Sequence, residues 1–130
     1  MEAILELNFA AVPTAATRAR TEMTERFGPR LAARVLDDVR LLVTELITNA
    51  LRHGSLRKGD RVSLKAWLTG DVLRIEVRDP GRDGNVAQRE SGQRGGGYGL
   101  FLVEKLTKRW GVDRRDGTVV WCEVPSGADR

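Results

Sequence analysis

Apolar and polar residues alternate in two neighbouring segments of the chain, residues 61–68 and 72–79. A period of two places the apolar side chains of a strand on one face and the polar ones on the other. Thr69-Gly70-Asp71 stands between the segments and supplies residues that favour a turn. The pattern therefore predicts a hairpin in an antiparallel sheet that has one buried and one solvated face.

The segment from Leu31 to His53 has a different period, because its apolar residues recur every three or four positions. This spacing predicts a long helix with one buried face. Gly54 follows at the position where helices often end in a glycine. The apolar positions are Val35, Leu36, Val39, Leu42, Val43, Leu46, Ile47, Ala50 and Leu51.

The remaining segments complete the predicted order of elements. Residues 4–9 read as a first strand, and a helix over 15–27 follows, with Thr14 as its N-cap and Gly28-Pro29 as its end. A third helix is predicted from Tyr98 to Arg109.

A closing hairpin is predicted from residues 110–112 and 118–124, turned by Arg115-Asp116-Gly117. The resulting order, β-α-α-β-β-α-β-β, predicts an α+β two-layer sandwich. Its helices would pack on one face of a mostly antiparallel mixed sheet.

Length and composition narrow the class of protein. The 130 residues are 41% hydrophobic, which suits a single domain over 1–130 with a buried core. Cys122 is the only cysteine and His53 the only histidine, so an intrachain disulfide and a Cys/His zinc site are excluded. No apolar run reaches the about 18–20 residues of a membrane helix, and no basic leader is present. We therefore expect a cytoplasmic protein without membrane contact.

The net charge of +4 is small, and the basic residues are spread along the chain rather than gathered in one block. Direct binding to nucleic acid is therefore not expected. A small arginine-using nucleic-acid module remains an alternative, and a steep salt dependence of DNA binding would identify it.

Polar residues interrupt the long helix at its apolar border. Glu45, Asn49 and His53 fall within a stripe roughly 80° wide, since each residue turns the helix by about 100°. Asparagine is unfavourable within a helix. One interpretation is that the Asn49 amide oxygen binds Mg²⁺, which prefers hard oxygen ligands, with Glu45 beside it as a base. The alternative is a solvated glutamate and an asparagine that bonds locally.

A second candidate is Asp79-Pro80-Gly81, which directly follows a predicted strand. Asp79 should share the inward face of Val77, two residues earlier. A buried carboxylate is costly unless a donor reaches it, and the exocyclic amine of a nucleobase is such a donor. The alternative is an ordinary turn at the end of the strand.

The third candidate is a glycine-rich stretch, because seven of the 14 glycines lie between Gly81 and Gly99. Gly95-Gly-Gly-Tyr-Gly-Leu100 opens a predicted helix, where free N–H groups and the helix dipole favour phosphate. The stretch has neither a Walker A ending nor the parallel βαβ unit of a Rossmann fingerprint. A flexible linker is the alternative.

Together and in this order, the three candidates resemble the Bergerat-fold ATP-binding superfamily, which includes type II topoisomerases and sensor histidine kinases. Glu45, Asn49 and His53 look like its N box, Asp79-x-Gly81 its G1 box, and Gly97-x-Gly99-Leu100 its G2 box. The segment Leu-Val-Thr-Glu-Leu-Ile-Thr-Asn-Ala (residues 42–50) and the final strand are most similar in sequence to those of the anti-sigma factor serine kinases of bacteria. In the G1 box, Asp83 stands where the family pattern has glycine.

The resemblance implies a role for each matching residue. Glu45 would be the general base and Asn49 the ligand of Mg²⁺. Asp79 would accept from the adenine amine, with Gly81 giving the ring space and Thr118 supporting the base. Gly97, Gly99 and Leu100 would bind the phosphates of ATP. Residues 85–96 contain only two small apolar side chains, too few to offset the entropy of ordering the backbone. We therefore expect this segment to be a lid that orders when ATP binds, and the alternative is a loop that stays mobile whatever is bound.

The same resemblance implies a regulator that sequesters a sigma factor. Such a protein uses ATP to phosphorylate a serine or threonine of an anti-sigma-antagonist protein, and it is typically a homodimer. The length favours a free-standing domain of this kind. The alternative within the same fold is a nucleotide-binding switch that holds its partner without kinase activity.

Overall fold

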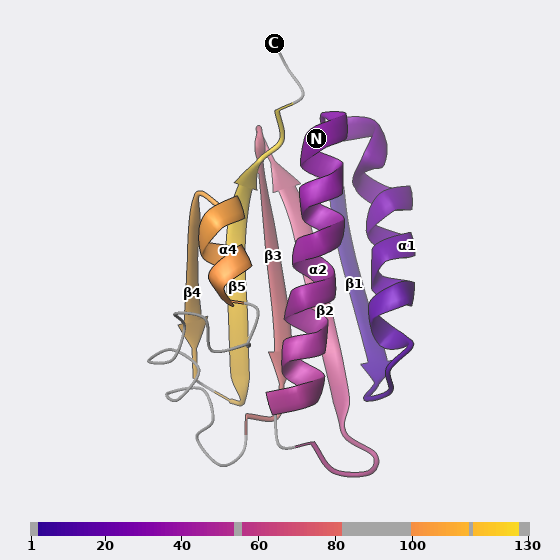
Figure 1. Cartoon of the computed structure of the whole chain (residues 1–130). Helices are drawn as coiled ribbons and strands as arrows, with labels where there is room; N and C mark the ends of the chain where they lie inside the picture. Colours follow the sequence, from indigo (N-terminus) through magenta and orange to yellow (C-terminus); the bar gives the residue numbers. More distant parts are fainter. Residues whose placement is uncertain (1–2, 54–55, 82–99, 115, 128–130) are drawn as a thin grey trace.

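The described strands form one sheet, and helices cover one of its faces (Figure 1). The computed structural model describes residues 3–53, 56–81, 100–114 and 116–127, without the side chains of residues 3 and 53. Within these residues the strand order is β1-β2-β3-β5-β4, and every ladder is antiparallel. The strands are β1 (Ala3–Ala10), β2 (Arg61–Thr69), β3 (Val72–Asp79), β4 (Arg109–Asp113) and β5 (Thr118–Pro125).

The helices are α1 (Ala15–Phe27), α2 (Ala33–His53) and α4 (Leu100–Leu106), with a short 3-10 helix, η1 (Gly28–Arg30), between α1 and α2. The α-helices of the described residues lie on the same side of the sheet, so the predicted α+β two-layer sandwich is confirmed (Figure 1). Within the described part of the chain, none of the helices has both the length and the hydropathy needed to cross a membrane.

Residues directly opposite one another on neighbouring strands build the core beneath the helices. One such row runs through the five described strands, and its residues in β1, β2, β3 and β5 are buried. Met23 and Phe27 of α1 and Leu42 of α2 belong to the same core cluster. The alternation in β2 and β3 thus marks the buried face, as predicted. The row consists of Leu5, Ala66, Ile75, Cys122 and Trp110.

The opposite face of the sheet is polar and carries paired charges. Arg74 forms ion pairs with Glu76 and with Glu123, each at 2.9 Å. The Arg74 guanidinium also lies 4.2 Å from the centre of the Trp121 ring. These contacts are typical of a solvated sheet face, as the alternating pattern predicts.

The predicted N-cap of α1 is wrong in its mechanism, although the helix begins at the predicted residue. Thr14 makes no side-chain capping bond, and its backbone angles are helical (φ −73°, ψ −7°) rather than extended. The Ala15 N–H instead donates to the Val12 carbonyl at 3.0 Å. A backbone turn therefore satisfies a donor at the start of the helix in place of the threonine hydroxyl.

Two further helix ends differ from their predictions because backbone N–H groups there bond to residues that are distant in the sequence. The long helix begins at Ala33, not Leu31, since Leu31 is extended and the Ala32 N–H donates to the Ser126 carbonyl at 3.0 Å. The last helix ends at Leu106, not Arg109. There the Lys108 N–H donates to the Glu123 carbonyl at 2.8 Å, and β4 begins at the next residue.

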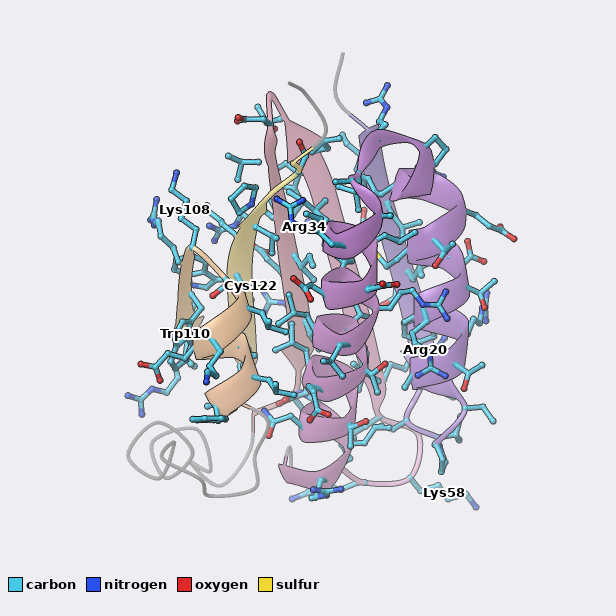
Figure 2. All side chains as sticks on the ribbon, turned by 45° about the horizontal axis from the view of Figure 1, so that its top comes forward. Arg20, Arg34, Lys58, Lys108, Trp110 and Cys122 are labelled. Carbon is cyan, nitrogen blue, oxygen red and sulfur yellow. The ribbon has the colours of Figure 1, made fainter. Side chains whose placement is uncertain are left out.

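Cys122 belongs to the buried row of the sheet, directly opposite Trp110 at the end of that row, and Figure 2 shows the two residues near each other. Burial raises the pKa of its thiol to about 12, from an ordinary value of 9.0. Above pH 9 the unfolded thiol ionises while the folded one keeps its proton. We therefore expect the free energy of unfolding to fall above pH 9 by up to about 1.4 kcal/mol per pH unit.

Urea unfolding of the wild type and of Cys122→Ala, followed from pH 8 upward, checks this prediction. Other groups titrate in the same range, so the difference between the two slopes is the quantity to compare. Equal slopes would contradict the prediction.

Candidate nucleotide site

The candidate residues that the structure describes gather at one end of the molecule. The C-terminal end of α2, the end of β3 and the beginning of β5 lie together at the lower edge of the sheet in Figure 1. Asn49 comes from the last turns of α2, Asp79 is the last residue of β3, and Thr118 is the first of β5. The tertiary structure therefore brings the N box and the G1 box of the sequence to the same end of the fold.

Asn49 is buried, with only 4% of its surface exposed. Its side-chain oxygen, Oδ1, has no hydrogen-bond partner in the described structure. A buried polar atom left unpaired costs about 1–3 kcal/mol, so such an atom points to a ligand at this position. The alternative interpretation, in which the Asn49 side chain bonds locally, would require a hydrogen bond that this oxygen does not form in the described structure.

The Asn49 oxygen suits Mg²⁺, which binds hard oxygens and commonly completes its shell with water and substrate phosphates. Within the described residues, no group of three or more His, Cys, Asp or Glu side chains could hold a metal by itself.

Glu45 lies one helical turn before Asn49 and is partly exposed. A carboxylate at the border between the buried and solvated faces is accessible to a second substrate beside the ligand site. His53 is the last residue of α2, and its side chain lies outside the described part of the chain.

Asp79 is buried, with 3% exposed, and it faces inward like Val77, as predicted. Its Oδ1 accepts a hydrogen bond from the Gly81 N–H at 2.6 Å. One oxygen of the Asp79 carboxylate thus takes part in a turn at the end of the strand, as the alternative interpretation predicts. Because a buried carboxylate with two oxygens accepts several bonds, the turn does not exclude a ligand amine.

Asp79 and Thr118 are directly opposite one another on β3 and β5. Thr118 is also buried, with 1% exposed. Both side chains stand on the helix-covered face, where they extend the inner rows of the sheet with polar groups. The register therefore places Thr118 on the strand next to Asp79, the position from which the resemblance implies that it would support the nucleobase.

Gly81 has a positive φ of +67°, which side chains rarely adopt. A Cβ at this position would lie 2.4 Å from the Thr118 hydroxyl oxygen and 2.7 Å from two backbone atoms of residues 117 and 118. Gly81 therefore allows the turn after β3 to pack directly against the start of β5.

Gly117 lies beside Asp79, although the sequence pattern predicts only a turn at this residue. Its φ is +95°, and a Cβ there would lie 2.4 Å from the Asp79 carbonyl oxygen. Asp116 before it also has a positive φ, of 54°, and its carbonyl accepts from the Arg78 side chain. The Asp-Gly pair predicts such a turn, but its contact with residue 79 follows only from the tertiary structure.

Leu100 is the first residue of α4 and is buried, with 1% exposed. Its side chain packs with Val103 in the core, so it anchors the beginning of this helix. Gly97, Gly99, Asp83 and the predicted lid over 85–96 lie outside the described residues.

A family model matches most of the chain. The family model described as histidine kinase-like ATPase domain matches residues 6–123. This range contains the three candidate boxes and every strand from β1 to β5, apart from the ends of β1 and β5.

Several curated relatives carry the name anti-sigma F factor. One from Thermoanaerobacter sp. (strain X514) is 31% identical over 81 residues, which is 61% of this chain and 56% of the relative. One from Clostridium acetobutylicum is 44% identical over 46 residues, which is 35% of this chain and 32% of the relative. The chain thus matches little more than half the length of the Thermoanaerobacter relative.

Solved structures show the same arrangement of elements. The crystal structure of the RsbU and RsbW domains of Rv1364c from Mycobacterium tuberculosis has a TM-score of 0.71 at 22% identity, covering 94% of this chain and 32% of that one. A histidine kinase domain of a blue-light activated kinase from Erythrobacter litoralis has a TM-score of 0.59 at 22% identity, covering 90% and 61%. At these identities the likeness concerns the fold, and it confirms the predicted Bergerat architecture.

Proposed function

This chain belongs to the histidine kinase-like ATPase domain family, and we propose on that premise that it binds ATP with Mg²⁺ as an anti-sigma regulator. The observation that carries the nucleotide site is the buried, unpaired oxygen of Asn49 at the end of the fold where Asp79 and Thr118 also lie. A buried acceptor without a partner is costly, and a magnesium ion that binds with a nucleotide would satisfy it.

Each described residue has a distinct part in this proposal. Asp79, whose Oδ1 also accepts from the Gly81 N–H, accepts from the adenine amine, and Thr118 supports the base from the neighbouring strand. Asn49 holds the magnesium ion, which neutralises phosphate charge when bound. Gly97 and Gly99, with the beginning of α4 at Leu100, bind the phosphates through backbone N–H groups.

The partners follow from the relatives named anti-sigma F factor. We propose that the chain sequesters a sigma factor, acts as a homodimer, and phosphorylates a serine or threonine of an anti-sigma-antagonist protein. Its whole length would then serve as one nucleotide-binding domain. Asp83 in the G1 box favours the second candidate, a nucleotide-binding switch that sequesters its partner without kinase activity.

Thermal unfolding with and without Mg-ATP tests the nucleotide site. A ligand at about one hundred times its Kd stabilises the folded state by about 2.7 kcal/mol. The expected result is a higher Tm with Mg-ATP, and a smaller rise for Asn49→Ala or when EDTA removes the metal. An unchanged Tm with both ATP and ADP would reject the nucleotide site.

Glu45→Gln separates the kinase from the switch. A general base must lie within hydrogen-bond reach of the hydroxyl that it deprotonates, and Glu45 is the partly exposed carboxylate one turn from Asn49. We expect this variant to lose phosphorylation of the antagonist by about 10²–10⁴-fold while it keeps binding ATP and the sigma factor. Radiolabelled phosphate transfer measures the rate.

The matched control is Asp37→Asn, a neutralised carboxylate on the exposed face near the start of the same helix. Equal rates in the wild type and Glu45→Gln would show that Glu45 is not the base. If the wild type binds ATP tightly but transfers no phosphate to the antagonist, the chain is a nucleotide-binding switch without kinase activity.

A further inference from the structure

A groove with a basic rim lies at the end of β1, and its residues Asn8 and Arg61 also line a neighbouring cavity that includes Asp79. Two adjoining cavities of about 540 and 380 Å³ form it, and they share Ala10, Val12 and Arg61. The first continues along the beginning of α1 to Arg18, and the second along the turn before β2 to Lys58. We refer to these two cavities together as the β1–α1 groove.

The lining of the β1–α1 groove includes apolar residues, among them Phe9, Ala10 and Val12, which we call its floor. Val12 stands between the two cavities with 44% of its surface exposed. Phe9 lies beneath the first cavity, buried with 3% exposed, and the Arg18 guanidinium is 5.7 Å from the centre of its ring. An exposed valine within a concave surface is a favourable contact for an apolar side chain of a partner.

The rim of the groove carries four cations: Arg18, Arg57, Lys58 and Arg61. In the part of the chain that the structure describes, no carboxylate forms an ion pair with Arg18, Arg57 or Lys58. Asp60 is the one acidic residue of the rim in the described structure, and its carboxylate accepts from the backbone N–H of Arg57 at 2.7 Å. The groove therefore presents an excess of positive charge around an apolar floor.

We propose that the β1–α1 groove binds an acidic peptide segment of a partner protein, with an apolar side chain seated on Val12 and carboxylates facing the basic rim. The charge favours an acidic partner, and the apolar floor favours a peptide over a nucleic acid. Single-stranded nucleic acids need exposed aromatic rings for base stacking, whereas the Phe9 ring is buried beneath Arg18. The proposal does not rest on the nucleotide site, because Asn49, Asp79 and Thr118 line neither cavity.

Titration of the ¹⁵N-labelled chain with synthetic peptides tests the proposal. The probe is a peptide built of glutamate and leucine, and the comparison peptides replace leucine by serine or glutamate by lysine. We expect the glutamate–leucine peptide to shift amide signals within residues 8–18 and 56–61 and to bind more tightly than both others. A tighter lysine–leucine peptide, or shifts confined to other residues, would overturn the proposal.

Reversal of the rim charges provides the matched variants. Arg18→Glu with Lys58→Glu should weaken the glutamate–leucine peptide by at least about tenfold, since each attraction becomes a repulsion. Arg34→Glu reverses one charge, as Lys58→Glu does, on an exposed side chain at the other end of the molecule, where Figure 2 shows Arg34 far from Lys58. This control should keep the affinity within about twofold.

The reversed variants also distinguish an acidic peptide from a nucleic acid or a second copy of the chain in the groove. Lys58→Glu alone, in the exposed turn before β2, replaces the double variant if the latter does not fold. ATP binding should be the same in the reversed variants and the wild type, so the experiment tests the peptide groove independently of the nucleotide site. Equal peptide affinity after reversal, tighter binding of an oligothymidylate than of the peptide, or a dimer that dissociates on reversal would each overturn the proposal.

Discussion

Replacing Asp79 with asparagine is expected to weaken ATP binding by about 1–3 kcal/mol, a factor of roughly five to 150, while the protein stays folded. The carboxylate is 3% exposed, and its Oδ1 accepts from the Gly81 N–H at 2.6 Å. Asparagine keeps one oxygen for this turn. It then presents its NH₂ group where the second carboxylate oxygen would accept from the adenine amine, so that a donor faces a donor.

Isothermal titration with Mg-ATP measures this change. Asp71→Asn is the matched control, since it neutralises an exposed aspartate in the β2–β3 turn, where the backbone carbonyl and not the side chain bonds Ser126. The control should bind ATP like the wild type. Unchanged affinity in folded Asp79→Asn would show that the G1 box is assigned to the wrong residue.

Gly81→Ala is expected to lower the free energy of unfolding by more than about 2 kcal/mol and to weaken ATP binding as well. The positive φ of +67° alone costs an alanine about 1–2 kcal/mol. The new Cβ would also lie 2.4 Å from the Thr118 hydroxyl oxygen and 2.7 Å from two backbone atoms, so the start of β5 must move. That movement displaces Thr118, which faces Asp79 across the ladder.

Gly70→Ala isolates the steric part of this effect. Gly70 has nearly the same φ, +62°, but a Cβ there would meet no atom within 4 Å. Urea unfolding should therefore show that Gly70→Ala lowers the free energy of unfolding by about 1–2 kcal/mol. Gly81→Ala should lower it distinctly more. Only Gly81→Ala should weaken ATP binding. Equal losses of stability in the two variants would mean that the turn after β3 does not pack against β5 as described.

The local pattern of the sequence determined most elements of the fold. The alternation in 61–68 and 72–79 and the helical period of 31–53 correspond closely to β2, β3 and α2. These patterns succeed because burial of one face follows from the period of the backbone itself. For the same reason, the sequence placed Asn49 at the buried border of α2 and Asp79 on the inward face of β3, and the structure confirms both.

Contacts between distant parts of the chain decided the remainder. The Lys108 N–H and the Ala32 N–H bond to β5 and to residue 126, and these two bonds set the end of α4 and the beginning of α2. No local propensity encodes a partner that lies many residues away. Likewise, glycine at 117 predicts a turn, but its approach to the Asp79 carbonyl depends on which strands become neighbours.

The unpaired oxygen of Asn49 is the clearest case of a property that only the tertiary structure decided. The sequence placed an amide at the edge of an apolar helix face, where it could equally have bonded to its own backbone. Packing of α2 against the sheet buried the side chain and left this oxygen without a donor in the described structure. Whether a buried polar group is satisfied depends on every neighbour that packs around it, so no local pattern in the sequence can determine it.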